Sequence, residues 1–410
     1  MNAHSCLPKL LIVVSSLDLT QPFSATPAWW QLLKGLYEIG TDVIVTPYQG
    51  AGIESLWWRA ESNPAYWQGE VFRLGRALLR RLRPPAPPPD PSQQSANAQG
   101  GGREGLADRL TRQVAQTLIA PLWERHLDSI LRRHSDTDAV IFLTVPLNHL
   151  RGVAAEIRRK HNKPILYYDG DVPASLPNLR GFASGFRMYQ GADLDEYDGF
   201  ISNSLGGLDM LRSLGARRAH VLYYGADPDV FNPLDVEQDI DAFFYGHGQE
   251  YRAEWIRAMI TEPSLALERE GRRFAVRGTY LGGLGRAELL PYLSFSKLRI
   301  YACRSKLNLC ITRGAHASVY GSSSSRPFEL AALGCCIVSN PYAGLELWFE
   351  PDREIIVVHS AEEALERYRH LLAHDAERQA VGQAARRRLL AEHTYRHRAR
   401  QLLDIVREYL

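Results

Sequence analysis

The sequence predicts an α/β protein with two Rossmann-like domains, each built on a parallel sheet. The chain has 410 residues, which is more than one hydrophobic core usually contains. Residues 9–50 have the order strand, loop, helix and strand, and a strand followed by a glycine loop and a helix begins again at residue 241. Strands that alternate with helices are typical of parallel sheets. We therefore expect one sheet in each half of the chain.

In the first half, short apolar runs predict strands and longer periodic runs predict helices. Strands are expected at 9–16, 42–48, 139–146, 164–171 and 198–204, and helices at 28–40 and 106–134, with two more that end near residues 161 and 214. The loop after the first strand contains no G-x-G-x-x-G, so the sequence does not predict a dinucleotide site there.

The composition changes between residues 57 and 83. Trp57, Trp58 and Trp67 precede an amphipathic helix that is rich in arginine. The arginines are Arg73, Arg76, Arg80, Arg81 and Arg83. Such a segment either lies on an anionic membrane surface or packs on the domain by its apolar face. Residues 84–105 are rich in Pro, Gly, Ser and Gln and are expected to form a disordered insertion.

The second half repeats the pattern of strands and helices. Strands are expected at 241–248, 273–278, 307–312, 335–339 and 354–359, with a helix at 249–259 and another before a turn at Pro291. From Ser360 the chain is predicted to be helical, because Ser360 and Glu363 have the spacing of a capping box.

The most informative stretch covers residues 321–346, GSSSSRPFELAALGCCIVSNPYAGLE. Pro327 suits the first turn of a short helix over 326–333, and Gly334 suits its end. The free N–H groups and the positive end of such a helix favour an anion such as phosphate. Short hydroxyls from Ser322 to Ser325 would add donors, and Arg326 would add a fork that binds phosphate at two points.

Glu329 lies one turn further along this helix, where a carboxylate would accept hydrogen bonds from the hydroxyls of a sugar. An alternative interpretation needs no ligand. A capped helix with an acidic first turn and a flexible serine loop would have the same sequence.

This stretch resembles the donor-binding segment of GT-B glycosyltransferases, and most of all the R-x-F-E-x-x-A-x-G pattern of the CgeB-like group within the glycosyltransferase group 1 family. The pattern matches Arg326, Phe328, Glu329, Ala332 and Gly334. In related transferases the matching glutamate binds the ribose of a nucleotide-sugar, and the helix start holds the diphosphate. The resemblance therefore implies that Ser324, Ser325, Arg326 and Glu329 bind the donor.

This sequence departs from the family pattern at two places. Many retaining members have a second glutamate eight positions before the first, and here that position is Gly321. The sequence therefore does not predict a retaining mechanism. Residues 342–346, YAGLE, stand where many GT-B enzymes have G-G-x-x-E, so the resemblance implies a donor contact at Glu346 although Ala343 replaces the first glycine.

Residues 219–233 resemble the segment in which GT-B chains cross between domains, through Gly225, Asp227, Phe231 and Pro233. This implies a boundary near 230–238. The expected parts are an acceptor-binding domain at 1–235, a nucleotide-sugar-binding domain at 236–390 and a C-terminal helix at 391–410 that braces the first domain.

The loop after the first strand borders the acceptor in GT-B enzymes. Ser24 and Thr26 lie in this loop and either contact an acceptor or cap the following helix.

Asp171 is the candidate catalytic base. It stands at the carboxyl end of a strand, where open α/β sheets place ligands, and YYDGDVP resembles the D-x-P element of the CgeB-like group. A base there would take the proton from an acceptor hydroxyl; the alternative is a turn residue before Pro173. Two D-x-D strings, at 169–171 and 193–195, resemble the aspartate pairs that hold a metal in GT-A transferases. GT-B enzymes bind donors without that metal, so the resemblance implies no metal site here.

Three more residues are candidate donor contacts. Gly246 follows a strand, and its backbone would allow a phosphate to approach closely. Arg252 resembles the arginine of the family's G…R element, with a surface arginine as the alternative. Arg313 follows the strand at 307–312 and would offset the charge of a departing diphosphate. His316 is a second candidate for this role, with a loop residue as the alternative interpretation.

Composition excludes several classes of function. The formal net charge of +2 gives no case for nucleic acid, and no segment approaches the length of a membrane span. The five cysteines are Cys6, Cys303, Cys310, Cys335 and Cys336, without C-x-x-C spacing. They indicate neither a zinc site nor a disulfide framework, so a cytoplasmic setting, with possible membrane association, is expected.

Taken with the resemblance, these features imply a metal-independent glycosyltransferase without a cofactor, for which the nucleotide-sugar is a co-substrate and a glycan, lipid-linked or protein hydroxyl is the acceptor. A nucleotide-sugar 2-epimerase and a non-catalytic sugar-nucleotide-binding protein remain alternatives. The sequence leaves the sugar, the base, the stereochemical outcome and the oligomeric state open.

Overall fold

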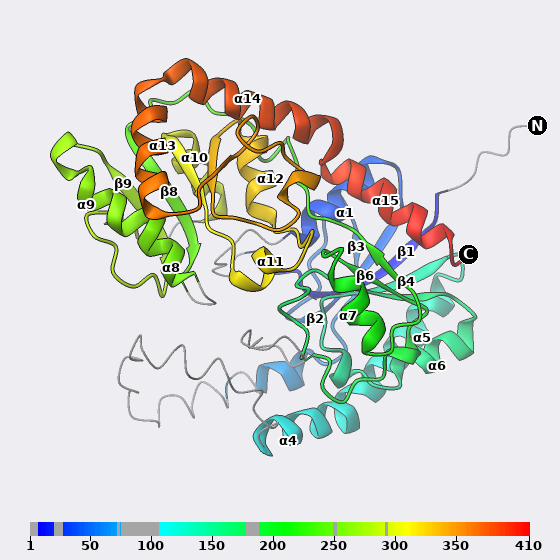
Figure 1. The fold of residues 1–410 in the computed structure, drawn as a ribbon. Coiled ribbons are helices and arrows are strands. Elements are labelled where there is room, and N and C mark those ends of the chain that lie inside the picture. Colours follow the sequence, from blue (N-terminus) through cyan, green and yellow to red (C-terminus); the bar gives the residue numbers. More distant parts are fainter. Residues whose placement is uncertain are drawn as a thin grey trace, which may run out of the picture.

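The computed structural model describes residues 7–19, 28–71, 74, 106–177, 188–248, 252–291 and 294–410. Within these residues the chain forms two sheets with helices on both faces (Figure 1), and every strand pair in both sheets is parallel. The predicted α/β fold with two Rossmann-like sheets is confirmed. Ser24, Thr26, the arginines from Arg73 to Arg83 and the segment 84–105 lie outside the described residues.

The first sheet has the strand order β3-β2-β1-β4-β5-β6-β7. Its strands are β1 (Leu10–Ser16), β2 (Val43–Gln49), β3 (Arg59–Ala60), β4 (Ala139–Leu143), β5 (Ile165–Asp169), β6 (Gly199–Ser202) and β7 (Ala219–Val221). Strands β1, β4 and β5 are almost entirely buried apolar runs, as expected for parallel strands that are covered on both faces.

Helices cover both faces of this sheet (Figure 1). They are α1 (Trp29–Glu38), α4 (Leu106–Val114), the π-helical turn Ala115–Ile119, α5 (Ala120–Arg133), α6 (Val153–His161) and α7 (Gly207–Ser213), with short 3-10 turns at Leu147–His149 and Leu194–Glu196. Alternate residues of β1 enter different cores: Leu11 and Val13 pack with α5 and α6, and Leu10 and Ile12 pack with α1. This alternation follows from the two-residue period of a strand.

The second sheet has the order β10-β9-β8-β11-β12-β13. Its strands are β8 (Ile240–His247), β9 (Phe274–Thr279), β10 (Glu288–Leu289), β11 (Ser305–Cys310), β12 (Cys336–Ser339) and β13 (Ile356–Val357). In both sheets the strand order reverses once, between β1 and β4 in the first and between β8 and β11 in the second. Ligands of such folds bind at the carboxyl ends of the strands beside this switch.

Two layers of helices enclose the second sheet. They are α8 (Ala253–Ile256), the π-helical turn Arg257–Thr261, α9 (Glu262–Ala266), α10 (Phe295–Cys303), α11 (Gly314–Ser318), α12 (Ser325–Ala332), α13 (Ala361–Ala373) and α14 (Asp375–Glu392), with 3-10 turns at Glu268–Glu270 and Leu345–Leu347. Phe243 and Tyr245 of β8 pack with α10, α12 and α14, whereas Ala242 and Phe244 pack with α8 and α13.

The chain crosses between the two sheets twice, and the crossings are joined to each other. Ala226 N donates to His393 O at 3.2 Å, and Tyr395 N donates to Ala226 O at 3.2 Å. The buried guanidinium of Arg398 adds a bond from Nε to Tyr224 O at 2.8 Å. After the second crossing, α15 (Tyr395–Arg407) lies beside α1 (Figure 1) and contributes to the core of the first sheet.

Two local predictions can be compared with the structure. No helix precedes Pro291: residues 280–291 form loops around β10, and α10 follows instead. Ser360 does cap α13, since its Oγ accepts from Glu363 N at 3.1 Å, but the Glu363 side chain bonds to His359 N at 2.8 Å.

The tryptophans of residues 57–67 divide into two groups. Trp57 and Trp58 pack against α1, with ring centroids 5.8 Å and 6.0 Å from Trp30 and Trp29, while Trp67 is 75% exposed. Membrane contact through residues 57–83 therefore stays a prediction, with only Trp67 of the three available for it.

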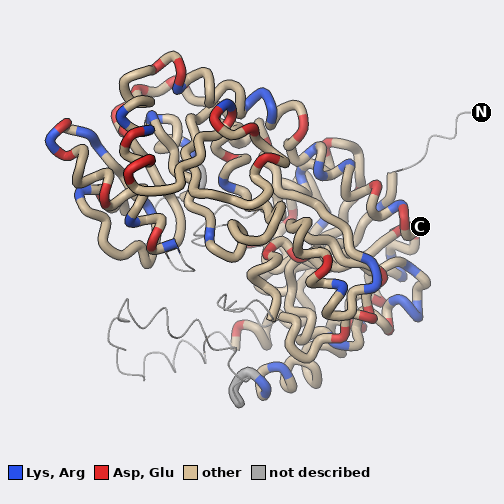
Figure 2. The backbone as a smooth tube through the Cα atoms, viewed as in Figure 1, with Lys and Arg blue, Asp and Glu red and all other residues tan. Residues whose placement is uncertain are grey.

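The surface carries both signs of charge in alternation, as Figure 2 shows along the outer helices. No helix in the described part of the chain combines the length and the apolar character needed to cross a bilayer. Cys303, Cys310, Cys335 and Cys336 are buried free thiols.

Leu402→Ala is expected to lower the free energy of unfolding by about 2–5 kcal/mol, because Leu402 is 1% exposed in α15 and its loss leaves a cavity in the first core. Urea denaturation followed by tryptophan fluorescence checks this. Leu410→Ala is the matched control: Leu410 is 61% exposed, so its removal should change the free energy by less than about 0.5 kcal/mol. Equal losses in the two variants would contradict the role of α15.

Candidate functional site

The candidate site lies at the carboxyl edge of the second sheet, beside its switch point. Strands β8 and β11 are neighbours there and end at His247 and Cys310. The start of α12 reaches the same edge. Across the boundary lie the carboxyl ends of β5 and β6 in the first sheet. Residues predicted separately from the sequence come together at this place.

Helix α12 begins at Ser325, one residue earlier than predicted, and Gly334 follows its end with a φ of 71°. Ser324 is the N-cap residue in extended conformation, and its side chain makes no capping bond. Ser324, Ser325 and Arg326 are partly exposed, whereas the rest of the helix is buried. The helix therefore presents its first turn and its positive end to the boundary between the sheets.

Arg326 is held at the end of β8. Its Cζ lies 4.7 Å from the ring centroid of Tyr245 and 5.3 Å from that of Phe244, within the range of cation–π attraction. A Cβ on Gly246 would lie 2.8 Å from Arg326 Nη2. The absence of a side chain at Gly246 therefore leaves room for the guanidinium, and a contact of Gly246 with phosphate stays a prediction.

Glu329 points inward from the same helix. It is 1% exposed, and its Oε2 accepts a hydrogen bond from the Tyr245 hydroxyl at 2.9 Å. Burial together with the negative charge of Glu329 raises the pKa of Tyr245 well above its usual range, so Tyr245 keeps the proton that it donates. The predicted contact of Glu329 with ribose stays a prediction.

Asp171 and Arg313 meet across the boundary between the sheets. Arg313 Nη2 donates to Asp171 Oδ1, and Arg313 Nε donates to His316 Nδ1 at 2.8 Å. His316 is 2% exposed, and burial with the nearby charges of Arg313 and Arg252 lowers its pKa well below the usual value. The neutral imidazole accepts the bond that orients Arg313 toward Asp171.

Asp169 fixes the loop that carries Asp171. Its Oδ1 accepts from Asp171 N at 2.8 Å, and its Oδ2 accepts from Tyr189 Oη at 2.6 Å and from Ser175 Oγ at 2.5 Å. Burial raises the pKa of Asp169 to about 6, although bonds from Ser175 and Tyr189 and the charge of Arg313 oppose the shift.

This pKa predicts a pH-dependent contribution to stability. Between about pH 4 and pH 6 the folded protein keeps a proton on Asp169 that the unfolded chain releases, because the ordinary value is 3.8. The free energy of unfolding should therefore fall as the pH rises through this window, by up to about 3 kcal/mol, and should change no further on this account above it. Asp169→Asn should lack the slope, and unfolding of both proteins at several pH values measures the difference. Equal slopes in the two proteins, or a wild type that gains stability relative to the variant as the pH rises, would contradict the assignment.

The four serines of residues 322–325 differ in burial. Ser322 and Ser323 are fully buried and join the two halves of the molecule. Ser204 Oγ and Ser322 Oγ are 2.6 Å apart, Asn203 Nδ2 donates to Ser323 O at 2.9 Å, and Ser323 N donates to Asn203 O at 2.9 Å. We call these bonds the Ser–Asn seam. Ser322 and Ser323 are therefore engaged in the seam, whereas Ser324 and Ser325 stay partly exposed, and a contact of the serines with phosphate stays a prediction.

Asn203 and Ser204 were missed as partners of this loop. They end the predicted strand at 198–204. A polar Asn-Ser pair at the carboxyl end of a buried strand is a signal that could have identified them as site residues. Nothing in the sequence connects them with Ser322 and Ser323, which lie more than a hundred residues further along the chain.

The remaining predicted contacts are distributed more widely. Arg252 precedes α8, and its Nε donates to Ile311 O at 3.2 Å, which places it at the same edge as Arg313. Glu346 is exposed, and its hydrogen bond raises the pKa of Tyr320. The predicted contact of Glu346 with the donor stays a prediction.

The second D-x-D string has a structural role. Asp193 Oδ1 accepts from Asp195 N at 3.1 Å, and Asp195 forms an ion pair with Arg217 at 3.1 Å. Neither D-x-D string belongs to the groups of converging metal-type ligands found among the described residues.

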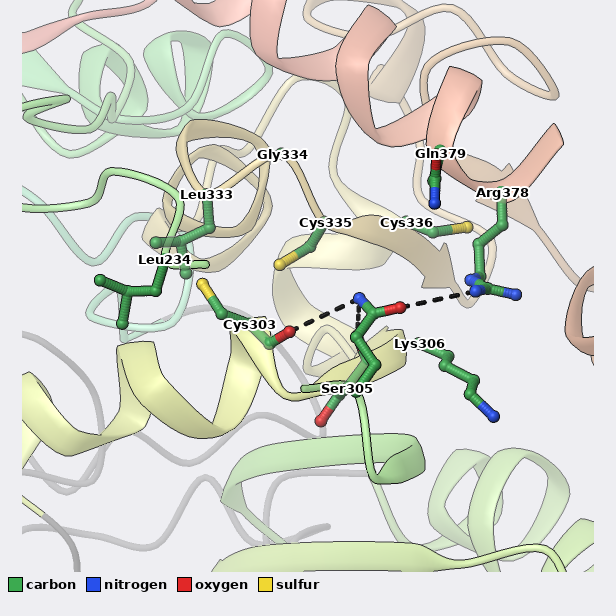
Figure 3. Close-up of a pocket in the computed structure, with 11 residues that line it drawn as sticks. Leu234, Cys303, Ser305, Lys306, Leu333, Gly334, Cys335, Cys336, Arg378 and Gln379 are labelled. Carbon is green, nitrogen blue, oxygen red and sulfur yellow. Dashed lines mark hydrogen bonds between the residues drawn. The ribbon is translucent and has the colours of Figure 1, made fainter. Parts of the chain in front are cut away.

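A separate cavity of about 110 Å³ lies at the opposite edge of the second sheet. Figure 3 shows that Cys303, Cys335 and Arg378 line it. Gln238 Nε2 donates to Cys303 O at 3.5 Å, and Arg378 Nη2 donates to Gln238 Oε1 at 3.5 Å. Burial raises the pKa of the thiols of Cys303, Cys335 and Cys336, all of which line the cavity. Because β11 and β12 begin here, this cavity is distinct from the candidate site.

Comparisons with known proteins show a family match in the second half of the chain and a similar fold over nearly the whole chain. Residues 252–404 match a family model described as glycosyl transferase-like. No curated protein matches the sequence. Sucrose-phosphate synthase from Thermosynechococcus elongatus is similar with a TM-score of 0.61, at 14% identity and over 98% of both chains.

Two further solved structures are similar over nearly their whole length. Anabaena HepE in complex with UDP and glucose has a TM-score of 0.59 at 11% identity, over 98% of this chain and 99% of that one. The α,α-trehalose 6-phosphate synthase from Burkholderia multivorans has a TM-score of 0.59 at 12% identity, over 98% and 97%. At these identities the likeness is one of fold.

Proposed function

Because this chain belongs with the GT-B glycosyltransferases, by its fold and by the family match over residues 252–404, we propose that it moves a sugar from a nucleotide-diphosphate donor to an acceptor hydroxyl. The family and the enzyme class expected from the sequence are confirmed. The CgeB-like subgroup and the division at residues 235 and 390 stay predictions.

The observation that carries the proposal is the position of Arg326. Its guanidinium lies over the end of β8 beside the first turn of α12, and Arg313 and Arg252 reach the same edge. A helix start with several arginines is suited to a diphosphate, because N–H groups and guanidinium forks both bind phosphate oxygens. Among the similar structures, HepE was solved with UDP and with UDP-glucose.

The proposed reaction is a single group transfer. The acceptor oxygen attacks the anomeric carbon, the bond from that carbon to the diphosphate oxygen breaks, and the nucleoside diphosphate leaves with the electron pair. Asp171 takes the proton of the acceptor hydroxyl. The arginines and the α12 dipole stabilise the charge that develops on the leaving group, so the proposal includes no metal ion and no cofactor.

The acceptor is proposed to bind at the first sheet, as a glycan, a lipid-linked sugar or a protein hydroxyl, in the cytoplasm. Peripheral membrane contact through residues 57–83 is part of the lipid-linked case. Its support is the exposed apolar side chains of Trp67, Val71 and Leu74.

The test is a titration and turnover screen with UDP-, GDP-, TDP- and CDP-sugars in the presence of EDTA. One nucleotide should raise the melting temperature, and the matching sugar should be released or transferred without added metal. Turnover of donor into its 2-epimer with no acceptor would favour the epimerase. Tight binding without turnover across acceptors would favour the non-catalytic protein, for which the absent glutamate at Gly321 is the argument. Absence of any nucleotide binding would overturn the proposal.

A further inference from the structure

A large aromatic side chain is exposed at the same edge of the second sheet. Tyr280 follows β9 directly and is 65% exposed. Strand β9 pairs with β8 up to the register His247–Thr279, so Tyr280 stands one residue beyond the last paired position. Burial of the side chain therefore does not explain why a tyrosine stands at this position.

The backbone of Tyr280 has an unfavourable conformation. Its φ is 55°, a left-handed value that is unfavourable for a residue with a side chain and free of cost for glycine. Glycines are frequent on both sides of it, in RGTYLGG, but this position is a tyrosine. Non-glycine residues in such conformations are concentrated at ligand sites.

The ring of His247 packs against the ring of Tyr280. The ring centroids of His247 and Tyr280 are 5.0 Å apart, with an angle of 48° between the planes. Burial and the charge of Arg252 lower the pKa of His247, so this ring is neutral at pH 7. Gly248 makes the contact possible, because a Cβ there would lie 1.9 Å from Tyr280 O, and Gly248 N donates to Thr279 O at 2.9 Å.

The aromatic pair lies next to the proposed phosphate site without occupying it. Gly246 contacts the Arg326 guanidinium, His247 is the next residue, and Tyr280 lies on the neighbouring strand, about 5 Å away in a parallel sheet. In a nucleoside diphosphate one sugar separates the base from the first phosphate. A base attached to a diphosphate at Arg326 would therefore extend toward residues at the end of the neighbouring strand, where Tyr280 lies.

We propose that the exposed ring of Tyr280, supported by His247, is the surface on which the nucleobase of the donor stacks. This inference rests on the proposed function and adds the base-binding part of the same site. Stacking on one aromatic ring is tolerant of base identity, since every base has a π face. Tyr280 thus supplies affinity for the nucleoside, and the arginines supply affinity for the diphosphate.

Calorimetric titration of the full chain with UDP and with inorganic pyrophosphate tests the proposal. Tyr280→Gly should weaken UDP binding about tenfold or more and leave pyrophosphate binding unchanged, while the melting temperature stays level or rises because glycine adopts this φ without cost. Tyr280→Phe should bind UDP like the wild type. Tyr37→Ala, which removes a 52% exposed tyrosine from α1, is the matched control and should change neither affinity.

The outcomes separate the two proposals. Equal UDP affinity in Tyr280→Gly and wild type, or an equal loss for UDP and pyrophosphate, overturns the stacking surface alone. A wild-type protein that binds neither UDP nor pyrophosphate overturns the proposed donor site and the stacking surface together. A loss confined to UDP, with a melting temperature at least as high as that of the wild type, supports the assignment.

Discussion

Asp171→Asn is expected to reduce sugar transfer about 100-fold or more and, at the same time, to tighten UDP binding about fivefold. The loss of transfer follows from removing the proposed base. The gain in binding follows from the ion pair, because Arg313 is held by the Asp171 carboxylate and the diphosphate must compete for it. Releasing a partly exposed ion pair of this kind is worth up to about 1 kcal/mol.

The Ser–Asn seam makes this expectation specific. Backbone and side-chain bonds of Asn203, Ser204, Ser322 and Ser323 hold the halves together, so the loss of the ion pair does not separate them. Calorimetry with UDP and a transfer assay measure the two effects. Asp209→Asn, which removes an 88% exposed partner of Arg212, is the control. Weaker UDP binding in Asp171→Asn would show that the ion pair supports the site instead of competing with the donor.

Arg326→Ala is expected to lower UDP affinity about 10- to 100-fold. Hydrogen bonds to charged groups contribute about 1.5–3 kcal/mol each, and the alanine also loses the guanidinium that stacks on Tyr245 and Phe244. Arg326→Lys should fall between, since it keeps the charge and loses the fork.

The control for Arg326 is an arginine of similar chemistry outside the site. Arg257 is 68% exposed, on the turn that follows α8, and pairs with Glu262. Arg257→Ala should leave UDP affinity unchanged. If Arg326→Ala bound UDP as tightly as the wild type, the diphosphate site at α12 would be wrong, and the proposed function would lose the observation on which it rests.

The sequence predicted those features that depend on local pattern. Strands such as β1 and β5 are short apolar runs, and α12 has Pro327 near its start and Gly334 after its end. Helix α10 was missed because its apolar residues do not gather on one face. Strand β10 has two residues, which is too short for any period to appear.

The site depended more on contacts between distant segments. Asp171 and Arg313 were both named from the sequence, but their contact joins positions 142 residues apart and could not be predicted from either. The four serines looked alike in the sequence. Their division into a buried pair in the Ser–Asn seam and an accessible pair at the start of α12 was decided by the partner loop at Asn203.

The packing of α15 has a consequence for how the protein is made. The first sheet draws part of its interior from residues 395–407, which are synthesised long after its own strands. Domains usually fold in the order of synthesis, but here the strands of the first sheet must wait, with one apolar side of α1 uncovered, until residues 395–407 have been synthesised. Newly made chains should therefore depend on chaperones more than a protein whose N-terminal domain is self-contained.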